Sequence, residues 1–218
     1  MSFSIVIPSR SDANLRACLA ALDRYEPDAQ VIVVDDGLVC PVVGCIVIAG
    51  VKPFVFARNC NLGMRHCAPN DVVLLNDDAI LKTDQGLTML AAAALSHPEY
   101  GVIAAASTNV GNRNQERKTP DAFRDEPRMV CFSCVFIKRS TIERVGLLNE
   151  EFVGYGFEDD AYCLRVRRAG MKIAVFDGCF VDHGTVKSTF RGGRYPVEGF
   201  KQNEAIFRKL FGAGNHDL

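Results

Sequence analysis

Three polar residues, Asn76, Asp77 and Asp78, follow directly on the apolar run Val72–Leu75. A run of four apolar residues is typical of a strand that is buried on both faces of a sheet. Carboxylates at the carboxyl end of a central parallel strand point into the crevice where open α/β sheets bind ligands. Two adjacent carboxylates repel each other unless a positive charge lies beside them. A hard divalent cation would supply that charge and would in turn bind a diphosphate, whereas the alternative is an acidic surface turn.

A second acidic group, Glu158-Asp159-Asp160, follows the flexible sequence Gly154-Tyr155-Gly156 and begins a predicted helix. Acidic residues in the first turn of a helix interact favourably with the helix macrodipole. On its own, this group therefore needs no function.

His183 follows the predicted strand Lys172–Val181 in the way that Asp78 follows its own strand. Both strands run toward the same edge if the sheet is mainly parallel there. A carboxylate and an imidazole together suit Mn²⁺ or Mg²⁺ that bridges phosphates, whereas a lone histidine is more often hydrogen-bonded and structural. Arg10 and Arg58 would add positive charge near an anion, although exposed arginines are usually only solvated.

The elements that position these residues begin with a βαβ unit. Ser4–Ile7 predicts a strand, and an apolar helix face (Leu15, Cys18, Leu19, Leu22) follows with Ser11 or Asp12 as its cap. The later predicted strands are Gln30–Val34, Cys45–Ile48, Val72–Leu75, Tyr100–Ala106, Met129–Lys138 and Lys172–Val181. Further helices are predicted from Pro53 to about Cys67, from Thr83 or Asp84 to Ser96, after the capping box Ser140–Glu143, from Glu158 to Gly170, and over Val197–Phe211.

The segment 107–128 is polar and charged and has no periodicity. A connection of this length in a compact domain is a lid, a binding loop or a disordered stretch. We therefore expect a mobile loop here, between a nucleotide-binding half (residues 1–106) and a second half (residues 129–218).

The composition is that of an ordinary globular protein. The chain has 218 residues, of which 48% are hydrophobic, and a formal net charge of −1. One α/β domain is the simplest organisation, and a general nucleic-acid binder is not expected. Nine cysteines without framework spacing indicate free thiols. Cys131 and Cys134 form a Cys-x-x-Cys, but their odd separation in a predicted strand turns them to opposite faces, which disfavours zinc.

Several other sequence patterns are absent. No Gly-x-Gly-x-x-Gly, Gly-x-x-x-x-Gly-Lys-Ser/Thr or Gly-x-Ser-x-Gly is present, which disfavours dinucleotide, P-loop and hydrolase sites. No window approaches the roughly 18 unbroken apolar residues of a membrane span, and the start of the chain lacks a signal pattern. We therefore expect a soluble protein of a bacterial, viral or host cytoplasm.

The motifs taken together resemble GT-A-fold glycosyltransferases of the family-2 type, over nearly the whole chain and in the family's order. The resemblance rests on Ile5–Arg10, Val33–Gly37, Ala57–Asn59, Leu75–Asp78, Val145–Phe152, Glu158-Asp159 and Leu164-Arg165. It implies a single GT-A domain over residues 1–218, with a Rossmann-like, mainly parallel mixed sheet flanked by helices. It also implies an inverting enzyme that uses a nucleotide-diphosphate sugar.

The resemblance implies roles for the nucleotide half. Asp36 would contact the base, and Arg58 would lie near the base or the diphosphate. Asp77 would lie near the ribose or the sugar. The residues that would line the nucleotide pocket are Pro8, Ser9 and Arg10.

The resemblance also implies the reactive groups. Asp78 and His183 would bind Mn²⁺ or Mg²⁺, and Asp159 would be the catalytic base. Glu158 or Asp160 would orient the acceptor. The chain departs from the family pattern in two places: Asn76 stands at the first position of Asp-x-Asp, and Ala161 stands where the family often has a second aspartate after Glu-Asp.

The expected reaction is transfer of a sugar from a UDP-linked donor, or next a dTDP-linked donor, to a hydroxyl of a glycan or other acceptor. The sequence specifies neither the sugar nor the acceptor, and it leaves open a role as part of a larger transferase. A sugar-phosphate nucleotidyltransferase is an alternative, but it would need a Gly-rich basic loop where Pro8-Ser9-Arg10-Ser11 stands. A non-catalytic module that binds sugar nucleotides or glycans is another.

Overall fold

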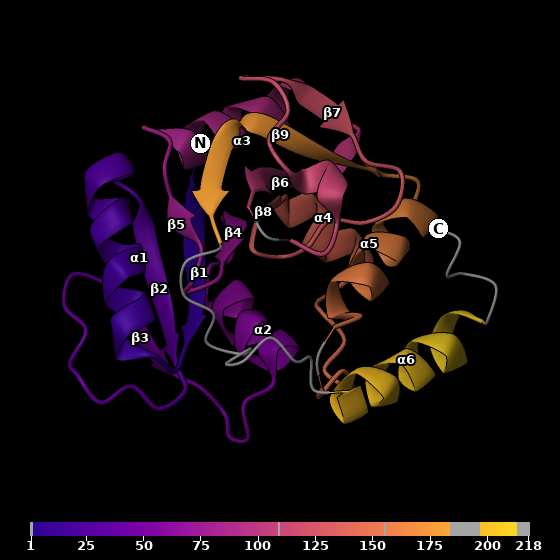
Figure 1. The fold of residues 1–218 in the computed structure, drawn as a ribbon, viewed down its shortest axis with the longest axis horizontal. Helices are drawn as coiled ribbons and strands as arrows, with labels where there is room; N and C mark the ends of the chain where they lie inside the picture. The colour runs from indigo at the N-terminus through magenta and orange to yellow at the C-terminus, as the bar shows by residue number, and fades with distance from the viewer. Residues whose placement is uncertain (1, 109, 155, 184–196, 213–218) are drawn as a thin grey trace.

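A mixed nine-stranded sheet between helices forms the body of the protein (Figure 1). The computed structural model describes residues 2–108, 110–154, 156–183 and 197–212. The strand order is β3-β2-β1-β4-β8-β6-β9-β5, and β7 also pairs with β9. The strands are β1 (Phe3–Ser9), β2 (Gln30–Asp35), β3 (Ile46–Ala49), β4 (Asp71–Leu75), β5 (Ile80–Leu81), β6 (Tyr100–Ser107), β7 (Phe123–Asp125), β8 (Cys134–Ile137) and β9 (Lys172–Asp182).

The direction of the strands brings the two expected metal ligands to one edge. The pairs β1–β2, β2–β3, β1–β4 and β6–β9 are parallel. Strand β8 runs antiparallel to both β4 and β6. It follows that β4 and β9 point the same way, and the residues after them, Asp78 and His183, lie at the same edge of the sheet.

Helices cover both faces of the sheet. One apolar layer packs α1 (Asp12–Tyr25) and α3 (Gly86–Ser96) against the sheet, and the other packs α2 (Phe56–His66), α4 (Arg139–Val145) and α5 (Glu158–Arg168). Adjacent strand residues enter opposite layers, since Ile5 and Ile7 belong to the first layer and Val6 to the second. A Cβ atom on Gly63 of α2 would lie 2.2 Å from Val6 Cγ1, so only glycine allows this close approach. The α/β architecture expected from the apolar patterns is confirmed.

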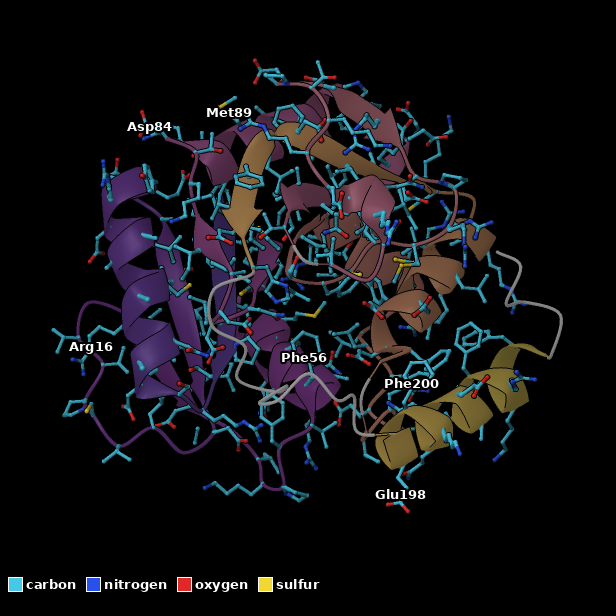
Figure 2. The ribbon with its side chains drawn as sticks, in the orientation of Figure 1. Arg16, Phe56, Asp84, Met89, Glu198 and Phe200 are labelled. Carbon is cyan, nitrogen blue, oxygen red and sulfur yellow. The ribbon has the colours of Figure 1, made fainter. Side chains whose placement is uncertain are left out.

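The last helix, α6 (Val197–Phe211), packs beside α5 (Figure 1). Its Phe200, labelled in Figure 2, has a ring centroid 4.9 Å from that of Phe157. Phe207 lies 5.5 Å from the same ring and is 4% exposed. Within the described parts of the chain, no helix has the length and apolar character needed to cross a membrane.

The start of α3 differs from our expectation that Thr83 or Asp84 caps it. The N-cap position is Gln85, which has a left-handed backbone (φ 51) and no capping side chain. The cap is distant in sequence: buried Glu26, at the end of α1, accepts hydrogen bonds from the N–H groups of Leu87 (2.9 Å) and Thr88 (3.3 Å). A carboxylate there also complements the positive end of the α3 dipole.

Three other boundaries also differ. Helix α2 begins at Phe56 rather than Pro53. Helix α4 begins after Lys138 with no side-chain cap, so the predicted capping box is wrong; Thr141 instead donates to Gly101 O (3.1 Å). Strand β8 begins only at Cys134, so Cys131 is outside it, and the opposite-face argument about the two cysteines was based on a strand that is too long.

The segment 107–128 is fastened to the sheet at several points. It contains a 3₁₀ turn (Arg113–Gln115) and β7, neither of which we predicted. Gln115 is fully buried and donates to Ala105 O (3.3 Å) and Cys131 O (3.0 Å). Arg124 donates to both oxygens of Asp177 on β9 (3.0 and 2.6 Å). The expectation that this segment is mobile stays a prediction.

Arg124→Ala should lower the free energy of unfolding by about 3 kcal/mol or more, because it leaves the fully buried carboxylate of Asp177 without its charged partner. Denaturant unfolding would measure this loss. Hydrogen exchange should also speed up at Lys118 and Thr119, whose N–H groups donate to the same carboxylate (3.1 and 3.0 Å). Arg113→Ala, in the exposed part of the segment, is the matched control and should change stability by less than about 0.5 kcal/mol.

Candidate functional site

A continuous line of contacts connects the ends of β2, β1 and β4. The N–H of Asp36 donates to Ser9 O (2.9 Å), and Ser9 Oγ donates to Asp77 Oδ2 (2.6 Å). The next residue, Asp78, approaches His183 across the sheet: the distance between Oδ1 and Nε2 is 3.2 Å. Five residues that the sequence nominated separately thus lie along one edge of the sheet.

Asp77 is buried, with 6% of its surface exposed. Burial raises the pKa of its carboxyl to about 6, with a further contribution from the charge of Asp78, while the hydrogen bond from Ser9 opposes the rise. Asp77 therefore combines burial with an adjacent like charge, and the charge of Arg10 only partly offsets them.

Asp36 lies at the end of β2 and is 7% exposed. Its Oδ1 atom is buried and has no hydrogen-bond partner among the described residues. The neighbouring residue Asp35 already has hydrogen-bond donors, since Asp35 Oδ1 accepts from the N–H groups of Gly37 and Leu38 (both 2.8 Å). A buried acceptor without a donor is costly in a folded protein, and an N–H group of a ligand would satisfy it.

Basic side chains surround this end of the sheet. The Arg10 guanidinium lies 5.1 Å from the centroid of the Phe54 ring, and Arg58 donates to Pro53 O. Lys52 was not predicted: its Nζ lies 3.1 Å from the position that a Cβ atom of Gly37 would occupy. No periodicity or motif marks a lysine between a strand and a helix, so sequence reasoning had no signal for it.

The geometry of Asp78 and His183 fits a divalent cation. Two adjacent ligands of an octahedral cation with bond lengths of ~2.1 Å lie about 3 Å apart, close to the 3.2 Å between Oδ1 and Nε2. The described residues contain no group of three or more His, Cys, Asp and Glu residues that would enclose a metal. Two protein ligands are nevertheless sufficient where the phosphates of a substrate and water complete the shell.

Thr108 supports His183 from the end of β6. Its hydroxyl accepts from the N–H of His183 (2.9 Å) and donates to Asp182 Oδ1 (2.9 Å). The Nδ1 atom of His183 is buried and has no partner among the described residues, although ligating histidines usually donate through their second nitrogen. Sequence reasoning missed Thr108 because it stands just after a strand whose composition indicates only burial.

The acidic start of α5 is strongly perturbed. Burial raises the pKa of Glu158 to about 7, and burial followed by the charges of Asp160 and Glu158 raises the pKa of Asp159 well above its ordinary value. Glu158 Oε2 is buried without a partner in the described structure. Simple first-turn carboxylates are solvated and keep ordinary pKa values, so this group differs from the helix-dipole explanation that its sequence allows.

Asn61 ties α2 to the segment that leads into α5. Its amide donates to Leu148 O and Glu150 Oε1 (both 2.9 Å) and accepts from the N–H of Leu148 (2.9 Å). The side chain is 1% exposed, so these bonds are shielded from water. Asn61 thereby fixes the connection between the nucleotide half and the acidic helix, a role that its position inside a helix does not indicate.

Several solved structures, among them that of a mannosyltransferase, share this fold. A structure of GalNAc-T7 with UDP, GalNAc and Mn²⁺ has a TM-score of 0.77 and 11% identity, covering 100% of this chain and 49% of that one. The mannosyltransferase PcManGT from Pyrobaculum calidifontis, with GDP-Man and Mn²⁺, has a TM-score of 0.67 and 15% identity, covering 98% and 70%. S. aureus TarS (residues 1–349) has a TM-score of 0.60 and 14% identity, covering 83% and 60%.

The chain therefore has the GT-A fold, and it spans about half the length of the GalNAc-T7 chain. A family model described as the N-terminal domain of galactosyltransferase matches residues 123–190. This range includes the acidic start of α5 and His183. No curated protein sequence is significantly similar to the chain. The solved structures show the fold, and the family model matches this part of the chain alone.

Proposed function

We propose that the protein is an inverting glycosyltransferase of the family-2 type. It transfers a sugar from a nucleotide diphosphate, UDP by preference and dTDP next, to a hydroxyl of a glycan or other acceptor. The observation that carries the proposal is the line of contacts from Asp36 to Asp77, which ends where Asp78 meets His183. This arrangement favours a ligand whose base binds at Asp36 and whose diphosphate binds at Asp78.

Each end of that line has its own chemistry. The unpartnered Oδ1 of Asp36 accepts the N3–H of uracil or thymine. Pro8, Ser9 and Arg10 border the nucleoside, and Arg58 adds positive charge toward the base or the diphosphate. Asp77 lies near the ribose or the sugar. The GalNAc-T7 structure with UDP and Mn²⁺ supports a UDP donor for this fold.

Asp78 and His183 would hold Mn²⁺ or Mg²⁺. A cation bound there would supply positive charge to the departing diphosphate. Asp159 accepts the proton of the acceptor hydroxyl as that oxygen attacks the anomeric carbon from the face opposite the diphosphate. Burial, followed by the charges of Asp160 and Glu158, raises the pKa of Asp159 and so increases its affinity for that proton. Glu158 and Asp160 orient the acceptor.

The direct test is thermal unfolding of the protein with a panel of UDP-, dTDP-, GDP- and ADP-sugars, each with and without Mn²⁺. A ligand at 100 times its Kd adds about 2.7 kcal/mol of stability. We expect stabilisation by a UDP-sugar that requires Mn²⁺, followed by release of UDP when acceptors are added. Nucleotide binding without turnover on any acceptor would favour a non-catalytic module. Release of pyrophosphate from a nucleoside triphosphate and a sugar phosphate would favour a nucleotidyltransferase.

The transfer rate should rise with pH over a range that Asp159 sets. Glu158 and Asp160 face this carboxylate along the helix, and Cys131 and Cys163 face it from its surroundings. A base acts only when deprotonated, so lowering the pH through the raised pKa removes activity. When kcat is measured between pH 4 and 9, the midpoint of its rise should therefore lie above about 3.9, the pKa of an ordinary aspartate. A midpoint at that ordinary value would contradict the assignment.

The compartment and any larger assembly stay predictions. We propose a cytoplasmic enzyme, and the coverage of about half of GalNAc-T7 is compatible with a domain of a larger transferase. Cell fractionation and the molecular mass of the native protein would test both.

A further inference from the structure

A cavity of about 320 Å³ opens at the carboxyl ends of β6 and β9. Its walls are Ser107, Thr108, Glu116, Arg117 and Phe180. This size is within the range of small-molecule sites. A larger cavity of about 450 Å³ lies at the opposite edge, at the amino ends of β1, β2 and β4, away from the residues described above.

The cavity adjoins the candidate metal ligands. Thr108, in its wall, is bonded to the backbone of His183 and to the carboxylate of Asp182. In the strand order, β6 and β9 lie beyond β4 and Asp78 as counted from Asp36 at the end of β2. A donor with its base at Asp36 and its diphosphate at Asp78 leaves this position outside the nucleotide.

Two charged side chains in the wall are available to a ligand. Arg117 lies over the ring of Phe180, with 5.6 Å from its Cζ to the ring centroid, so a cation–π contact holds the guanidinium at the cavity. Glu116 is fastened through its backbone, since its carbonyl accepts from Arg124 (3.1 Å). Neither side chain forms a hydrogen bond or ion pair with another of the described residues.

The chemistry of these groups suits a polyhydroxylated ring. A carboxylate accepts hydrogen bonds from neighbouring hydroxyls, and a guanidinium donates to hydroxyl and ring oxygens in a fixed planar arrangement. Phe180 supplies an apolar wall for the C–H face of such a ring. A phosphate alone would place a like charge beside the carboxylate of Glu116.

The segment that supplies Glu116 and Arg117 also reaches the acidic start of α5. The preceding residue, Gln115, accepts from the N–H of Cys131 (2.8 Å) and donates to its carbonyl. Cys131 lies close enough to Asp159 to experience its charge. One buried side chain, Gln115, thus joins the segment that lines the cavity to Cys131, and the group that gives its proton to Asp159 is the acceptor.

We propose that this cavity binds a neutral pyranose ring of the acceptor saccharide, with Glu116 and Arg117 as the residues that select it. The proposal rests on the proposed glycosyltransferase function and adds the position and chemical class of its acceptor. The matched control is Arg113, an exposed arginine in the same segment that does not line the cavity.

Direct binding tests the site without turnover. Saturation-transfer NMR with the methyl glycosides of glucose, galactose, mannose and N-acetylglucosamine should show contact with at least one glycoside in the wild type and in Arg113→Ala. The contact should be lost in Arg117→Ala and in Glu116→Gln. Equal signals in all four proteins, or none with any glycoside in the wild type, would overturn the proposal.

Kinetics then separate the acceptor from the donor. With the best donor, Arg117→Ala should raise the acceptor KM roughly tenfold to a hundredfold, the effect of losing a charge-assisted hydrogen bond. For hydrolysis of the donor in the absence of acceptor, KM and kcat should each stay within about twofold of wild type. A change confined to the donor KM would assign the cavity to the donor sugar and overturn the proposal. If no nucleotide sugar binds the wild type while the glycosides do, the proposed function fails and the saccharide site remains.

Discussion

Asp159→Asn should lower the rate of sugar transfer by about 10²–10⁴, the contribution of a positioned general base. The substitution keeps the size of the side chain and most of its hydrogen bonding but removes proton acceptance. Donor binding depends on the line of contacts from Asp36 to Asp78, which does not include Asp159. The Kd of the donor should therefore stay within about twofold of wild type. Single-turnover assays with the best donor and acceptor measure the loss in the chemical step directly.

The same variant separates the base from a helix-start residue through stability. Loss of a first-turn charge costs about 0.3–1 kcal/mol where the helix dipole dominates. Here burial and the charges of Asp160 and Glu158 raise the pKa of Asp159 in the folded protein. The stability that its proton provides is therefore present at low pH and is lost as pH rises through the raised pKa. At pH 8, Asp159→Asn should unfold at the same or a higher temperature than the wild type.

Asp160→Asn is the matched comparison, because it changes the neighbouring carboxylate in the same helical turn. It should mainly raise the acceptor KM. Turnover by Asp159→Asn within a few-fold of wild type would show that the base is another group. A fall in melting temperature together with normal turnover would return Asp159 to the helix-dipole explanation.

The sequence predicted those helices and strands whose local residue pattern agrees with their position in the fold. Apolar runs predicted the strands β1 to β4, and the spacing of Leu15, Cys18 and Leu22 predicted α1, with Ser11 as one of two candidate caps. These patterns report burial on a face, which is decided within a few residues along the chain. The meeting of Asp78 with His183, 105 residues apart, followed only from the assumption that their strands are parallel to each other.

The sequence could not predict contacts that distant residues decide. Glu26 caps α3 from another helix, and Arg124 fastens a polar segment by pairing with Asp177, which interrupts the apolar pattern of β9. In the sequence, a charged residue within a buried strand contradicts the expected apolar pattern, and its partner becomes known only from the structure. For the same reason, the perturbation of Asp159 was not predictable, since it depends on how deeply three-dimensional packing buries the start of α5.

Asp78→Ala should abolish the Mn²⁺-dependent part of UDP binding while the fold persists. A cation held at this edge would have two protein ligands among the described residues, and removal of one would leave only His183. Loss of a supporting residue around a bound metal commonly costs 10–100-fold in affinity, and loss of a ligand should cost at least that. Titration calorimetry of UDP with and without Mn²⁺ would measure the difference between wild type and variant.

The fold should survive this change because Asp78 follows strand β4 in a turn and is not part of the apolar core, although its side chain is only 10% exposed. We expect a change in stability of about 1 kcal/mol or less. Asp84→Ala, an exposed aspartate labelled at the edge of the molecule in Figure 2, is the control for lost negative charge. If Mn²⁺ strengthens UDP binding equally in Asp78→Ala and in Asp84→Ala, the cation lies elsewhere, and the 3.2 Å contact between Asp78 and His183 is a structural hydrogen bond.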